Sequence, residues 1–193
     1  MHYLQHLSML IQKASGLGHK TLADGTQLFG RAPHIAPEAW LHALFAPISD
    51  YQIDQIGSAV GSSVPEVFRD FLTLANGFSI FSDSLSIYGY RSNYERTTDS
   101  VWQPFNIITP NTVERLSDAS DWHFFIGGYP CGTGYFLYID TRDQKVYRCS
   151  RSSARPLQQW NSFPEMIVKE SSRLTVLFDD LGRKINPKEP VVS

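Results

Sequence analysis

Hydrophobic residues recur at intervals of three and four along the first part of the chain, which is the spacing of an amphipathic helix. Near the N-terminus, Leu4, Leu7 and Ile11 follow this period. Three segments carry a capping box, a serine followed three residues later by Gln or Glu: Ser49–Gln52, Ser63–Glu66 and Ser162–Glu165. Together these patterns predict helices at 1–15, 37–45, 50–60, 63–76, 111–119 and 162–178.

The period changes to that of strands between residues 78 and 151. Short strands are predicted at 79–81, 85–88, 105–108, 122–126, 135–139 and 145–149. Residues 140–144 have the length of a hairpin loop, and Asp24-Gly25 predicts a turn between two short strands around Leu22 and Leu28. We therefore expect an α+β fold, with an antiparallel sheet of about five to six strands flanked by helices. A βαβ alternation is absent, so we expect no dinucleotide-binding fold.

Composition narrows the class of protein. The 193 residues are 42% hydrophobic and 19% charged, which is the balance of a folded globular chain. Aromatic residues make up 13% of the chain, and we expect some of these rings to line a surface rather than a core. The net charge of −2 excludes a strong field for nucleic acid or anionic lipid, so we expect no nucleic-acid partner and no membrane partner.

The reactive side chains are few. Cys131 and Cys149 are too few for a disulfide scaffold or a four-thiolate zinc site, and they suit a reducing compartment. Among the six histidines only His2 and His6 have the helical i, i+4 spacing of metal ligands, and no third ligand lies near them in the sequence, so we expect neither a metal nor another cofactor. No stretch approaches the roughly 20 apolar residues of a spanning helix, and the first residues lack a signal-peptide core. We therefore expect a cytoplasmic protein.

The most unusual stretch is residues 127–134, which contains four glycines. Its backbone N–H groups could cradle an anion, or it could serve as a connection between strands that needs left-handed backbone conformations. Cys131 lies in this stretch, eight residues after His123, and Asp121 could orient the histidine. That arrangement would suit a Cys-dependent enzyme, although the sequence does not bring the three side chains together. Rapid alkylation of Cys131 at pH 6 would distinguish a catalytic thiol from a structural one.

Basic residues crowd the segment 142–155, namely Arg142, Lys145, Arg148, Arg151 and Arg155. If residues 145–151 form a strand, Tyr147 and Arg151 share one face and Arg148 lies on the other. The arginines could dock an acidic partner or a phosphate, or they could protect an edge strand from aggregation. The aromatic residues Tyr88, Tyr90, Tyr94 and Trp102 surround a polar segment, where they could form a binding rim or a small satellite core.

An ordered series of motifs runs from residue 40 to residue 178. It comprises Trp40, Phe45, Pro47-Ile48-Ser49, Ile56, Val60-Gly61, Val64-Pro65, Phe68, Phe71-Leu72, Asn76-Gly77, Leu85–Gly89, Phe125–Gly127, Gly134–Asp140, Val146-Tyr147 and Trp160–Glu165. In this order the motifs resemble the SUKH superfamily, which includes the Smi/Knr-type regulators of cell-wall synthesis and many bacterial immunity proteins. The chain departs from the family pattern at Phe78, where a second glycine is common, and at Thr133-Gly134, where an acidic residue is common.

The resemblance implies an α+β fold and a protein-binding role without catalysis. It divides the chain into an N-terminal extension at 1–36, a SUKH-like domain at 37–181 and a loose C-terminal tail at 182–193. We expect an immunity protein that neutralises a cognate bacterial toxin by direct binding. The alternative is a regulatory scaffold of cell-wall synthesis or signalling with the same fold. A few aromatic and arginine side chains supply most of the affinity in such interfaces, and we expect these to be Tyr88, Tyr90, Trp102, Tyr147, Arg148 and Arg151.

Overall fold

A computed structural model describes residues 2–91, 101–130 and 134–192. Its helices are α1 (His2–Lys13), a 3-10 helix η1 (Ala14–Leu17), α2 (Asp50–Val60), α3 (Glu66–Leu72), α4 (Ile108–Asn111) and α5 (Phe163–Thr175). Its strands are β1 (His19–Thr21), β2 (Gln27–Arg31), β3 (Trp40–Leu44), β4 (Phe78–Ile80), β5 (Leu85–Ile87), β6 (His123–Tyr129), β7 (Tyr135–Asp140), β8 (Val146–Ser150) and β9 (Gln158–Trp160).

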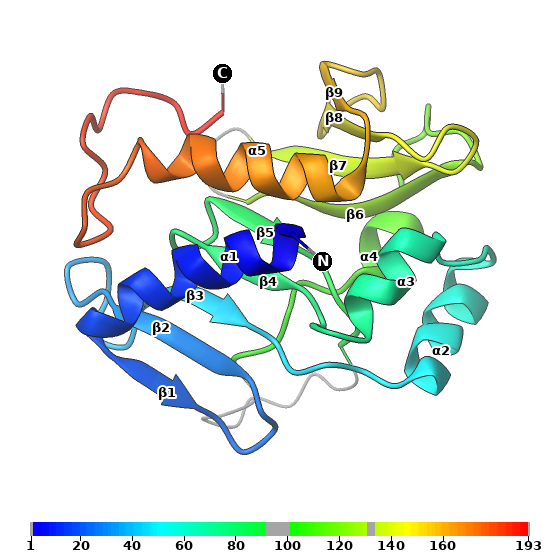
Figure 1. Ribbon diagram of the computed structural model, residues 1–193. Coiled ribbons are helices and arrows are strands. Elements are labelled where there is room, and N and C mark those ends of the chain that lie inside the picture. The colour runs from blue at the N-terminus through cyan, green and yellow to red at the C-terminus, as the bar shows by residue number, and fades with distance from the viewer. Residues whose placement is uncertain (1, 92–100, 131–133, 193) are drawn as a thin grey trace.

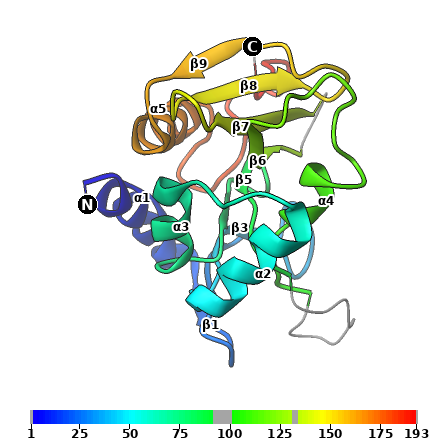
Figure 2. The ribbon, with the colours of Figure 1, turned by 90° about the vertical axis from the view of Figure 1, so that its right-hand side faces the viewer.

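The described strands form one sheet in which each strand pairs antiparallel with the next one along the chain. Figure 1 shows this order from β1 at the lower left to β9 at the top. In Figure 2 the view is turned, and α1 and α5 lie on one side of the sheet while α4 lies on the other. The predicted α+β class is confirmed. The sheet has nine strands, which is more than the five to six expected.

Two hydrophobic clusters hold these layers together. The larger one contains buried side chains of α1, α3, α5 and most strands, and the rings of Phe68 and Phe71 lie 5.5 and 5.2 Å from that of Phe163. The smaller one consists of Leu22, Leu28, Trp40, Ala43 and Phe45, and the half-buried Trp102 packs against it. A loop that follows residue 100 is thereby attached to the first strands of the sheet.

Several local predictions are confirmed. Helix α2 begins with the predicted capping box, because the Ser49 hydroxyl accepts from the Gln52 N–H and the Gln52 side chain accepts from the Ser49 N–H. It ends at Gly61, which has a left-handed φ of 75°. Strands β1 and β2 form the hairpin expected around Asp24-Gly25, and the predicted hairpin at 140–144 joins β7 to β8.

The helix predicted at 37–45 is wrong, since this segment contains strand β3. Trp40, Leu41 and Phe45 fit a helical stripe, but they fit a strand buried on both faces equally well. Strand β3 pairs with β2 on one side and with β4 on the other, and its first four residues are buried. The same apolar run is compatible with a helix and with a strand, and pairing with β2 and β4 makes it a strand.

The capping box predicted at Ser63–Glu66 is also wrong. The residue before α3 is Pro65, which makes no side-chain cap, and the helix ends at Leu72, before the predicted stop at Asn76-Gly77. This pair instead leads into β4. The Asn76 side chain donates from Nδ2 to the Tyr90 carbonyl (2.8 Å) and accepts from the Tyr90 N–H (2.7 Å), so it joins the start of β4 to the chain that leaves β5.

Three predictions fail between residues 105 and 160. The expected strand at 105–108 is a single bridge between Gly89 and Asn106 that leads into α4, and α4 precedes most of the helix expected at 111–119. Strand β9 was not predicted. Because β9 pairs with the outer side of β8, the interpretation of 145–151 as a charged edge strand is wrong.

Both ends of the described chain contact helix α5. The Tyr3 ring of α1 lies 6.1 Å from that of Phe163 in α5, with nearly perpendicular planes. In the C-terminal segment, the Val191 carbonyl accepts from Arg173 at 2.7 Å, and Val191 and Val192 pack against the larger cluster. The domain limits expected from the sequence stay a prediction.

Replacing Asn76 with alanine should destabilise the fold, because both peptide groups of Tyr90 would lose their partner. We expect the free energy of unfolding to fall by about 2 kcal/mol, measured by urea denaturation. The control is Gln159→Ala, which truncates an exposed amide side chain on β9 and should change stability by no more than about 0.5 kcal/mol. Equal stability of Asn76→Ala and the wild type would refute this role for Asn76.

Candidate functional site

A cavity of about 640 Å³ lies between the sheet and the loop at 101–110. We call it the central cavity. Its floor includes Ala43, Ser79 and Ile87 from strands β3, β4 and β5, and Phe136 from β7. Its wall is the run Val101–Asn106, followed by side chains around α4. A volume of this size falls within the range that protein ligand sites occupy.

A second cavity of about 380 Å³ adjoins the central cavity. Both are lined by Phe45, Trp102, Gln103 and Pro104, so this group forms a shared wall. The adjoining cavity reaches the β1–β2 turn at Asp24 and the start of α2. The two cavities therefore follow one face of the sheet across several strands.

Three of the six predicted anchors line the central cavity: Tyr88, Trp102 and Arg151. They come from the end of β5, the loop at 101–110 and the residue after β8, which are distant in sequence. The Tyr88 ring is buried and lies 5.8 Å from the Phe105 ring. Burial raises the pKa of Tyr88, so its hydroxyl keeps its proton at neutral pH and can act as a hydrogen-bond donor.

The fourth anchor, Tyr90, lines the adjoining cavity together with Asn76. Its backbone is fixed by the two hydrogen bonds to Asn76 described above. The aromatic residues expected to form a binding rim thus lie along one connected depression. Tyr94, which belonged to the same expectation, lies outside the described residues.

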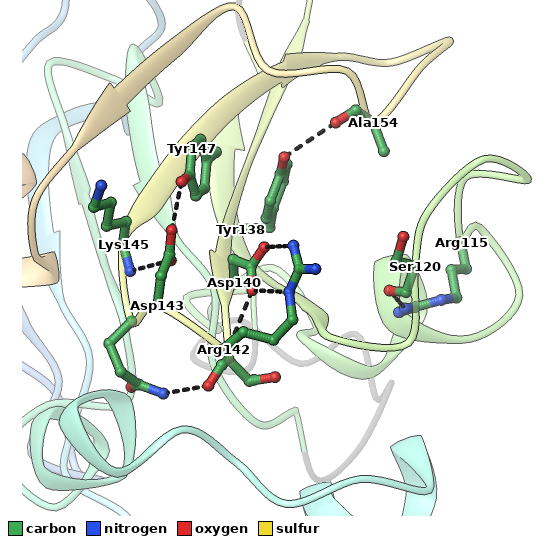
Figure 3. Close-up of polar contacts among 11 residues, drawn as sticks. Arg115, Ser120, Tyr138, Asp140, Arg142, Asp143, Lys145, Tyr147 and Ala154 are labelled. Atoms are coloured by element: carbon green, nitrogen blue, oxygen red, sulfur yellow. Dashed lines mark hydrogen bonds and ion pairs between the residues drawn. The ribbon is translucent and has the colours of Figure 1, made fainter.

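The other two anchors, Tyr147 and Arg148, do not line these cavities. Tyr147 stacks on Tyr138 with ring centroids 5.4 Å apart, and its hydroxyl donates to Asp143 at 2.7 Å, as Figure 3 shows. That hydrogen bond raises the pKa of Tyr147 to about 12. Arg148 is buried with its guanidinium 5.3 Å from the Tyr135 ring, on the face of β8 opposite Tyr147, as strand alternation predicts.

Charged groups of both signs line the central cavity, namely Asp83, Arg91, Glu114 and Arg151. The Asp83 carboxylate accepts from the Ser79 hydroxyl at 2.5 Å and from the Ser86 hydroxyl at 3.2 Å. Its charge is therefore already engaged within the fold. Glu114 is exposed at the margin of the cavity.

The Cys131–His123 arrangement is only partly visible, because Cys131 lies outside the described residues. His123 stacks on Tyr138 with centroids 4.2 Å apart, and burial lowers its pKa. Asp121 is exposed, and the structure shows no hydrogen bond between it and His123. The buried Nδ1 of His123 has no hydrogen-bond partner among the described residues. The other cysteine, Cys149, is buried, and burial raises its pKa to about 12, as expected for a structural thiol.

The glycine-rich stretch is described at residues 127–130 and 134. Gly127 and Gly128 belong to strand β6, and a Cβ on Gly128 would lie 2.9 Å from the Tyr88 hydroxyl oxygen. Glycine at this position therefore makes room for Tyr88 beside the cavity. Across the described ranges, no three His, Cys, Asp or Glu side chains gather where they could hold a metal ion.

Residues 47–169, more than half of the chain, match the model of the SMI1 / KNR4 family (SUKH-1). The chain belongs to this family. The resemblance recognised from the motifs is thereby confirmed at the level of the superfamily. A comparison with curated proteins finds no match. Within residues 2–91, 101–130 and 134–192, no helix has the length and apolar character needed to cross a bilayer.

The SUKH-1 match includes most of the loop wall of the central cavity, with Tyr88, Trp102 and Arg151. Other wall residues, above all Phe105, Gln103 and Pro104, were not predicted as site residues from the sequence. Phe105 was assigned to a strand, although a Trp-Gln-Pro-Phe run beside a polar segment is typical of a loop with exposed aromatic residues. The Trp-Gln-Pro-Phe run could therefore have identified this loop as a wall of the central cavity.

A third cavity, of about 560 Å³, lies between α1 and the end of α5. Apart from Phe81, its lining residues fall outside the SUKH-1 match. His42 of β3 contributes to it, and its Nδ1 accepts from the Phe81 N–H at 3.4 Å. Burial lowers the pKa of His42 to about 3, so the folded protein holds this imidazole neutral.

Stability should therefore fall when the pH drops below the ordinary pKa of histidine. Between pH 6.5 and pH 3 the unfolded chain binds a proton at His42 that the folded chain does not bind. The His42 contribution to the free energy of unfolding should decrease by about 2 kcal/mol between pH 7 and pH 5. Urea denaturation at both pH values measures it, and His42→Gln should remove that part of the difference.

The matched control is His34→Gln, which makes the same change at an exposed histidine. This variant should keep the wild-type loss of stability between pH 7 and pH 5. If His42→Gln and the wild type lose the same free energy over this range, the neutral buried state of His42 is disproved.

Proposed function

We propose that this SUKH-1 protein is a non-catalytic binding module that acts as an immunity protein. It would neutralise a cognate bacterial toxin in the cytoplasm by direct contact, with the central cavity as the contact surface. The observation that carries the proposal is the convergence of Tyr88, Trp102 and Arg151 on one cavity of about 640 Å³. Family membership supports a binding role for the domain.

The chemistry of the central cavity supports binding rather than turnover. Its lining is largely aromatic and aliphatic, with few charged side chains, and Asp83 is already bonded to two serine hydroxyls. Aromatic rings and arginine at the centre of a depression are the usual sources of affinity between proteins. The rings of Trp102 and Phe105 would exclude water around the arginine when a partner is seated.

The proposal is tested by isolating the tagged protein from its native host and identifying what co-purifies. A single stoichiometric partner that is toxic when expressed alone and harmless with this chain would support the immunity role. Several substoichiometric wall or signalling proteins, bound at micromolar strength, would contradict it and favour the regulatory scaffold.

Trp102→Ala should weaken binding of the captured partner by about 30-fold, because truncating a central aromatic anchor costs about 2 kcal/mol or more. Titration of the purified partner by calorimetry measures the change. Trp122→Ala is the matched control, since Trp122 is 38% exposed and lies outside the cavity lining. We expect the control to bind as tightly as the wild type. Equal losses in the two variants would place the contact surface elsewhere.

A further inference from the structure

Arg151 differs from most of the arginines that line or neighbour the sheet. Arg142 binds Asp140, and Arg173 binds the buried Glu170, each with a shortest distance of 2.7 Å. The structure records no ion pair or hydrogen bond between Arg151 and any described residue. The side chain of Arg151 is exposed, and it lines the central cavity. Its charge is therefore available to a group that enters the cavity.

Phe136 and Gly134 determine where the Arg151 side chain lies. Its guanidinium carbon lies 5.4 Å from the centroid of the Phe136 ring, within cation–π range. Gly134 leaves the space that the side chain occupies, because a Cβ on Gly134 would lie 2.5 Å from Arg151 Nε. The aromatic face supports the guanidinium without neutralising it. The planar fork thus keeps its donors for a carboxylate.

A second hydrogen-bond donor, the Tyr88 hydroxyl, belongs to a residue that lines the same cavity as Arg151. The positive charge of Arg151 acts on the pKa of Tyr88 and lowers it, while burial, the larger effect, raises it. The Tyr88 hydroxyl therefore remains protonated and able to donate. A carboxylate that reached Arg151 would meet a guanidinium in a cavity that a phenol also lines.

The acids of the cavity limit how many carboxylates it can accept. The Asp83 carboxylate is bonded to Ser79 and Ser86, so it does not compete for Arg151. Glu114 is near enough to Tyr88 to raise its pKa, and it makes no ion pair with Arg151. The attraction of Arg151 would offset the repulsion between Glu114 and one carboxylate, whereas a second carboxylate would also be repelled by the first. This charge arrangement favours one acidic group in an otherwise apolar ligand.

The extent of the cavities indicates an extended ligand. The central and adjoining cavities share Phe45, Trp102, Gln103 and Pro104, and the strand residues that line them lie on β3, β4, β5 and β7, with Arg151 directly after β8. Five strand spacings of about 4.8 Å give a path of roughly 24 Å. An extended chain rises about 3.3 Å per residue, so about seven residues would follow this path.

We propose that the central and adjoining cavities take an extended segment of about seven residues from a partner protein, apolar except for one Asp or Glu whose carboxylate binds the Arg151 guanidinium. The inference rests on the proposed function, since it names the part of the partner that this surface would recognise. Trp102 and Phe105 would cover the apolar residues, and Tyr88 would donate to the same carboxylate.

The test is selection from a random decapeptide library displayed on phage, with the full chain as the target. We expect the enriched peptides to carry one acidic residue among apolar ones. A synthetic copy of an enriched peptide should bind the Arg151→Glu variant at least tenfold more weakly than the wild type. Changing the peptide's acidic residue to Lys should restore binding to Arg151→Glu.

Arg155→Glu is the matched control, because it makes the same charge change at an exposed arginine of the same loop that does not line the cavity. It should bind the peptide within twofold of the wild type. Enriched peptides without an acidic residue, no enrichment at all, or equal losses in Arg151→Glu and Arg155→Glu would overturn the inference.

The failure of this inference can be separated from that of the proposed function. If the captured toxin is released by Trp102→Ala and retained by Arg151→Glu, the cavity binds its partner without using the carboxylate contact, and the inference alone is wrong. If no toxin is captured while acidic peptides still depend on Arg151, the inference stands and the immunity role is wrong.

Discussion

The contact between Asn76 and Tyr90 is the constraint on which the proposed contact surface, formed by the central and adjoining cavities, depends. One amide side chain satisfies both the N–H and the carbonyl of Tyr90, which fixes the chain where it leaves β5. Close approach is possible because Gly77 and Gly89 have no side chain. A Cβ on Gly77 would lie 2.4 Å from the Ile87 carbonyl oxygen, and one on Gly89 would lie 2.1 Å from that of Asn76. The chain at Tyr90 is therefore held beside Asn76, and both residues line the adjoining cavity.

The simple order of the sheet explains why its two sides differ. Every strand neighbours the next one in sequence, so the helices α1 and α5 come from the two ends of the chain and pack together on one side. On the other side of the sheet, the middle of the chain contributes the loop at 101–110 and the short helix α4 beside the central cavity. A loop and a four-residue helix cover less area than two long helices. The depression between them and the strands is the result.

Elements that are stabilised by contacts within a few residues could be predicted from the sequence. Strands that form only because a neighbouring strand pairs with them could not. The capping box at Ser49 and the turn at Asp24-Gly25 satisfy backbone groups within a few residues, so the sequence alone indicates them. Strand β3 fits two periods and became a strand because β2 and β4 flank it. Strand β9 has only three residues, two of them glutamines, and it exists because it completes the outer side of β8.

The sequence indicated only part of the proposed contact surface. Residue type suggested Tyr88, Trp102 and Arg151, but only the fold places residues so distant in sequence around one cavity. Strand alternation did separate Arg148 from Tyr147, and Arg148 lies buried against Tyr135. Arg148 is stacked and buried, whereas Arg151 is stacked at a cavity and exposed, which leaves its donors accessible. The chemistry of a guanidinium is the same at both sites, so access decides which of them can recognise a partner.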